Sequence, residues 1–103
     1  MFKLLLATDQ PHIQEAYGHY PWVELGFHAP LIATTSQEAI ELLESRAIDA
    51  VGYYFEKKNG VELSRYLHRD RPSLAIFSVS EDEQKQLQVL KELGEMMRRL
   101  HSD

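Results

Sequence analysis

The sequence predicts an α/β fold in which helices cover both faces of a parallel sheet. Two observations carry this prediction: short apolar runs alternate with segments of helical periodicity, and the links between them are short. Continuous apolar runs are typical of parallel strands, which are buried on both faces. We therefore expect a three-layer α/β/α sandwich that forms a single domain over residues 1–103.

An apolar run over residues 2–8 predicts the first strand, and it ends where Asp9 can cap a helix. Pro11 would lie in the first turn of that helix, a position that tolerates proline. Helical spacing places Ile13 and Ala16 on its inner face.

The middle strands are predicted at 31–34 and 48–54, with a helix between them. That helix begins at the capping box Thr35-Ser-Gln-Glu38, the clearest local signal in the chain. A third helix follows, for which Asn59 is the expected cap. It ends before the next proline, and residues 74–79 form the fourth strand.

A second capping box, from Ser80 to Glu83, begins a long final helix that runs to about residue 100. Large apolar residues recur on one side of it at intervals of three, four and three: Leu90, Leu93, Met97 and Leu100. This stripe spans only about two heptads, and it has two interpretations. Either it packs on the sheet, or it forms the seam of a homodimer or of a contact with a partner protein.

Parallel strands with right-handed crossovers favour the sheet order 2-1-3-4, which is flavodoxin-like but ends after the fourth strand. In such sheets ligands bind at the carboxyl ends of the strands. The edge beyond the fourth strand would be open to pairing with a second chain.

Composition excludes several functions. The chain has no cysteine, which excludes disulfides and thiolate chemistry, and its net charge of −5 argues against direct nucleic-acid binding. The first apolar run is too short for a signal peptide or a membrane span, so we expect a cytoplasmic protein without membrane contact. The histidines lack ligand spacing and no nucleophile is paired with a base. We therefore expect no metal, no cofactor and no enzymatic activity.

Three segments carry a family resemblance: KLLLATDQP (3–11), PWVELGF (21–27) and AIDAVGYYFEKKNGVEL (47–63). In order and spacing they resemble the receiver domains of two-component response regulators, most closely those that precede AraC-type DNA-binding domains. That subgroup has a Trp-x-x-Leu-Gly-Phe element after its first helix, which here begins at Trp22. The resemblance covers roughly residues 2–80.

The resemblance implies a phosphorylation pocket whose chemistry is lost. The two acids that bind Mg²⁺ in receivers correspond to Thr8 and Asp9, and the phosphorylated aspartate corresponds to Tyr54. The hydroxyl residue after the fourth strand corresponds to Ser78, and the family's lysine has no counterpart. A tyrosine cannot form an acyl phosphate and one carboxylate is a poor Mg²⁺ site, so we expect a vestigial pocket.

These observations predict a pseudo-receiver that regulates transcription through protein contact or dimerisation, without phosphorylation. If the natural protein is longer, the resemblance implies a DNA-binding domain after Asp103. Two alternatives remain open. One is a small-ligand sensor that uses the vacated pocket, and the other is a true receiver phosphorylated at an acid outside the alignment.

Overall fold

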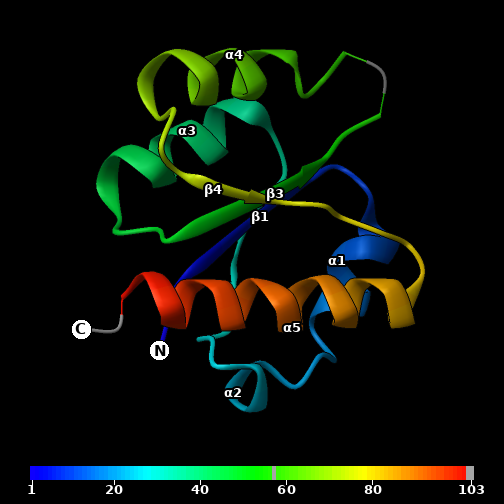
Figure 1. The fold of residues 1–103 in the computed structure, drawn as a ribbon. Coiled ribbons are helices and arrows are strands. Elements are labelled where there is room, and N and C mark those ends of the chain that lie inside the picture. The colour runs from blue at the N-terminus through cyan, green and yellow to red at the C-terminus, as the bar shows by residue number, and fades with distance from the viewer. Residues whose placement is uncertain (57, 102–103) are drawn as a thin grey trace.

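The structure, a computed structural model, describes residues 1–56 and 58–101, and residues 57, 102 and 103 lie outside the described part. It contains a four-stranded parallel sheet in the order β2-β1-β3-β4 (Figure 1). The strands are β1 (Leu4–Thr8), β2 (Leu31–Ala33), β3 (Ala50–Tyr54) and β4 (Ala75–Phe77). The helices are α1 (Pro11–Tyr17), α2 (Trp22–Leu25), α3 (Ser36–Ser45), α4 (Val61–Asp70) and α5 (Glu83–Leu100). The predicted fold class and strand order are confirmed.

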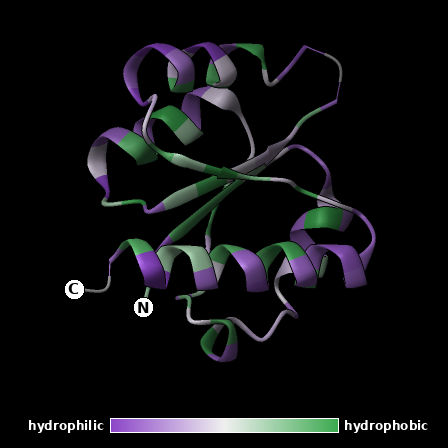
Figure 2. Cartoon of the chain, viewed as in Figure 1, coloured by the Kyte–Doolittle hydropathy of each residue, from purple (hydrophilic) through white to green (hydrophobic). Residues whose placement is uncertain are grey.

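The sheet separates two hydrophobic cores. Successive side chains of β1 point to opposite faces: Leu5 and Ala7 pack beneath α3 and α4, whereas Leu4 and Leu6 pack against α1, α2 and α5. All five residues of β1 are buried, which is why this strand lacks polar alternation. Figure 2 shows mainly hydrophobic strands, with the hydrophilic residues concentrated on helices and loops.

Tyr17, and not the predicted Ala16, shares the inner face of α1 with Ile13. Ile13 and Tyr17 are buried, whereas Ala16 is exposed. The ring of Tyr17 lies 5.8 Å from the ring of Trp22, whose Nε1 donates a hydrogen bond to the carbonyl oxygen of Tyr17 at 2.8 Å. The larger side chain takes the inner position because it can pack against the tryptophan of α2.

The predicted capping box of α3 is confirmed in its main hydrogen bond. The predicted N-cap of α5 lies two residues before the observed one. Thr35 Oγ1 accepts a hydrogen bond from the N–H of Glu38 at 3.1 Å. At α5 the cap is Asp82, whose carboxylate accepts from the N–H of Lys85 at 3.1 Å. Ser80 does not cap the helix, because its Oγ accepts from the N–H of Asp82 and so shapes the preceding turn.

The apolar stripe of the last helix packs on the sheet. Leu90, Leu93 and Met97 are buried in the core beneath β1, β3 and β4, which removes them from any dimer seam. Only Leu100, with 72% of its surface exposed, is free of the core. The interpretation of these four residues as a partner surface is therefore wrong for three of them.

In the described part of the chain, no helix is both long and apolar enough to cross a membrane.

We predict that Leu93→Ala lowers the free energy of unfolding by about 2–4 kcal/mol, because it removes buried methyl groups and leaves a cavity. The matched change Leu100→Ala should alter it by less than about 0.5 kcal/mol, because that side chain is largely exposed. Urea unfolding followed by circular dichroism measures both. Equal losses in the two variants would contradict the packing of α5 described above.

Candidate functional site

Asp9 joins two loops at the carboxyl edge of the sheet. Its Oδ1 accepts hydrogen bonds from Gln10 Nε2 at 3.0 Å and from the N–H of Glu56 at 3.2 Å, and its Oδ2 accepts from Asn59 Nδ2 at 2.8 Å. Asp9 and Asn59 were predicted to cap α1 and α4, and both predictions are wrong because the two side chains bind each other instead. The carboxylate thus ties the β1–α1 loop to the β3–α4 loop.

The same hydrogen bonds act on the charge of Asp9. The donor from Asn59 is the largest of the influences that hold the pKa of Asp9 below its ordinary value, partial burial opposes it, and Gln10 and Glu56 add to the lowering. Asp9 is therefore ionised at neutral pH. Its internal donors occupy three of the roughly four acceptor positions of a carboxylate, which leaves little of it for a metal ion.

Asn59 also holds the β2–α3 loop, since the buried Ser36 donates through Oγ to the carbonyl oxygen of Asn59 at 2.6 Å. This hydrogen bond between Ser36 and Asn59 could not be predicted from the sequence, because a contact between distant loops leaves no periodic pattern. The three loops surround a hollow of about 480 Å³. Its lining consists of polar residues only: Asp9, Thr34, Thr35, Ser36, Gln37, Asn59 and Glu62. The Glu62 carboxylate and the acceptor position that remains on Asp9 suit a small ligand that donates hydrogen bonds.

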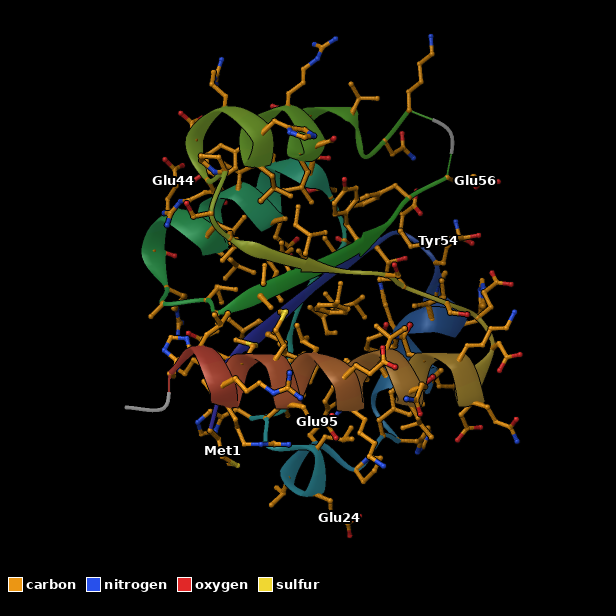
Figure 3. All side chains as sticks on the ribbon, in the orientation of Figure 1. Met1, Glu24, Glu44, Tyr54, Glu56 and Glu95 are labelled. Carbon is orange, nitrogen blue, oxygen red and sulfur yellow. The ribbon has the colours of Figure 1, made fainter. Side chains whose placement is uncertain are left out.

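Thr8 and Tyr54 are neighbours, as predicted, but they do not line this hollow. They pair in register where β1 and β3 end. Thr8 is fully buried, and its Oγ1 accepts from the N–H of Gln10 at 3.1 Å. Tyr54 is 39% exposed and borders a separate hollow of about 290 Å³ with Gln10, Phe55 and Glu56. Figure 3 shows Tyr54 and Glu56 extending from the end of β3 towards the outside of the molecule.

Ser78 directly follows β4, at the same edge of the sheet, and it does not line the hollow beside Asp9. It is exposed, and its carbonyl oxygen accepts from Gln86 Nε2 at 3.1 Å, while Gln86 Oε1 accepts from the N–H of Ser80 at 2.5 Å. Gln86 is fully buried and fixes the turn between β4 and α5. Its position four residues before Leu90, on the inner side of α5, is the signal that could have identified it.

Within residues 1–56 and 58–101, no group of three or more His, Cys, Asp or Glu side chains is arranged to hold a metal ion. The predicted pocket residues are thus a carboxylate held by internal hydrogen bonds, a buried threonine, an exposed tyrosine and an exposed serine. The geometry offers a polar hollow beside Asp9.

Comparison of the chain with protein-family models, with curated proteins and with solved structures found no match. The resemblance to receiver domains therefore stays a prediction from the sequence motifs. The sheet order 2-1-3-4 is compatible with it, because flavodoxin-like folds share this order.

We predict that Asn59→Ala destabilises the protein more at neutral than at acid pH. Asn59 favours the ionised form of Asp9 and lowers its pKa in the folded state. The resulting stability is fully present above the unfolded value of about 3.9, and it is lost as the pH falls through the lower folded value. Urea unfolding at about pH 7 and about pH 2 measures the difference.

The control for this experiment is Asn59→Ala in an Asp9→Asn background. A double-mutant cycle isolates the interaction between the two side chains, and the pH dependence of the Asn59 effect should disappear when residue 9 cannot ionise. An Asn59→Ala effect of the same size at both pH values would show that the carboxylate of Asp9 is not the partner that matters.

Proposed function

We propose that this chain is a receiver-like module that acts through protein contact and does not carry out phosphotransfer. The observation that carries the proposal is the engagement of Asp9, the one acid at the position where receivers bind Mg²⁺, by three internal hydrogen bonds. Mg²⁺ sites normally combine one or two carboxylates with phosphate and water. Tyr54, at the end of β3, supplies no second carboxylate and no acceptor for an acyl phosphate.

The loops of the site are held in a way that supports a constant conformation. Phosphorylation switches a protein when added charge shifts an element between two arrangements. Here the N–H of Glu56 and the amide of Asn59 already bind a charged group, and Ser36 fixes Asn59 from the other side. A module whose loops are held in this way acts through its surface, by binding another protein.

The resemblance to receivers of AraC-type regulators further implies that the protein acts in the cytoplasm and that it is part of a transcriptional regulator. The net charge of −5 supports contact with protein and not with nucleic acid. The contact surface cannot be the stripe of Leu90, Leu93 and Met97, since these side chains form the core.

Sensing of a small ligand is a second candidate function, and the hollow beside Asp9 favours it. A polar lining that includes Asp9 and Glu62 suits an amine or a polyol. A ligand that binds the folded protein raises its unfolding temperature, so a panel of amines and polyols can be screened by thermal unfolding. A rise that is lost in Glu62→Gln would support this function, and no response across the panel would count against it.

We predict that acetyl phosphate and Mg²⁺ leave the protein unmodified, because Tyr54 cannot form an acyl phosphate and Asp9 is held by internal donors. Intact-mass spectrometry measures the outcome, with an active receiver domain treated in parallel as the positive control. Stoichiometric labelling of Asp9 or of another acid would overturn the proposal and favour a working receiver with a displaced acceptor.

A further inference from the structure

One edge of the sheet is open along β4. The strand pairs with β3 on one side, and no strand of the described residues pairs with its other side. Figure 1 looks onto this edge: β4 passes between α4 and α5, and no helix lies in front of it. An edge strand presents backbone N–H and C=O groups that another strand can bind, so the group that fits here is an extended chain.

β4 itself is short, with three residues, but the segment around it carries no charge or proline that would prevent such pairing. Natural edges carry charged residues, proline or a bulge, or are covered by other segments. Residues 73–80 read Ser-Leu-Ala-Ile-Phe-Ser-Val-Ser, without a charge, a proline or a glycine, and Ile76 in the middle is 51% exposed. Uncharged segments rich in β-branched and aromatic residues pair readily with identical segments.

The opposite edge, at β2, is better protected. Pro30 directly precedes β2, and proline removes a backbone donor where a further strand would begin to pair. Ile32, the exposed residue of β2, has 36% of its surface accessible, less than Ile76. The two edges therefore differ, and β4 is the one suited to a partner.

One side of α5 adds apolar surface next to this edge. Gly94 lies against α2, where an added Cβ would come within 2.9 Å of the Leu25 carbonyl oxygen. The opposite flank of α5 carries Val89, Met96 and Leu100 together with the exposed Lys85 and Glu92, and we call its three apolar residues the apolar flank. Because α2 lies beneath α5 in Figure 1 and β4 above it, this flank is on the side of the open edge. Met96 is 42% exposed there.

We propose that β4 pairs with β4 of a second copy in antiparallel orientation, about a two-fold axis near Ile76, so that the two sheets become continuous. This dimer rests on the contact function proposed above and names its partner. The antiparallel arrangement places Ile76 opposite Ile76 of the second copy, and Ala75 opposite Phe77 of the second copy. A small residue thus faces a large one in both positions, and no like charges oppose each other across the pair.

The symmetry explains why the partner is a second copy. A two-fold axis perpendicular to the sheet leaves both α5 helices on the same face, so the apolar flank of one copy approaches that of the other. Within the described residues each chain leaves one side of β4 unpaired, so pairing of two copies gives a closed two-fold dimer. One contact then pairs the uncharged β4 strand with an extended strand and also covers the neighbouring apolar flank.

Sedimentation equilibrium over a concentration series tests the proposal. The full chain should show a reversible monomer–dimer equilibrium, and Ile76→Lys should raise the dissociation constant at least about tenfold, equivalent to about 1.4 kcal/mol. The matched control is Ile32→Lys, which places the same charge on the β2 edge and should leave the dissociation constant unchanged. Circular dichroism confirms that each variant is folded.

A second variant keeps the test decisive if Ile76→Lys fails to fold. Met96→Glu changes an exposed residue of the apolar flank and should also weaken the dimer. A wild-type chain that stays monomeric at millimolar concentration would overturn the proposal, and so would a dimer that Ile32→Lys dissociates while Ile76→Lys or Met96→Glu does not. Labelling by acetyl phosphate does not depend on oligomeric state, so that experiment judges the proposed function separately.

Discussion

The hydrogen bond between the carboxylate of Asp9 and the amide of Asn59 is the interaction on which the carboxyl edge of the sheet depends. It spans fifty positions of the sequence and joins the loops that follow β1 and β3. Because Ser36 donates to the carbonyl oxygen of Asn59, the loop after β2 is held as well. Asp9, which the sequence resemblance aligns with a metal-binding acid of receivers, here holds loops together, and these loops surround the polar hollow.

The other constraint on function is that one face of a helix cannot be both core and interface. The lower face of the sheet presents Leu4, Leu6 and Phe77, which must be covered to leave water. The buried stripe of α5 meets this need, so it is not available to a partner. Within the described residues no strand pairs with the outer side of β4, which is the edge that we propose for a second copy.

The fold could be predicted because its signals are local. Buried apolar runs and the capping box at Thr35 depend on neighbouring residues. The pairing of Thr8 with Tyr54 is not local, and it was expected from the resemblance to receivers. The site could not be predicted fully, because Asp9 could either cap α1 or bind Asn59. Which of the two contacts forms depends on the position of a loop that is distant in the sequence. Periodicity identified the inner side of α5 but could not say what it packs against.

The most direct test of the account is an amide NMR spectrum recorded before and after addition of Mg²⁺ and beryllium fluoride, a mimic of the aspartyl phosphate. The mimic needs a free acceptor carboxylate and a bound metal ion, whereas here Asp9 is held by Asn59, and the residue that the resemblance aligns with the acceptor is Tyr54. We expect an unchanged spectrum. Localised shifts of the amides around Thr8, Asp9, Tyr54 and Ser78 would contradict it, since they would reveal a working acidic pocket.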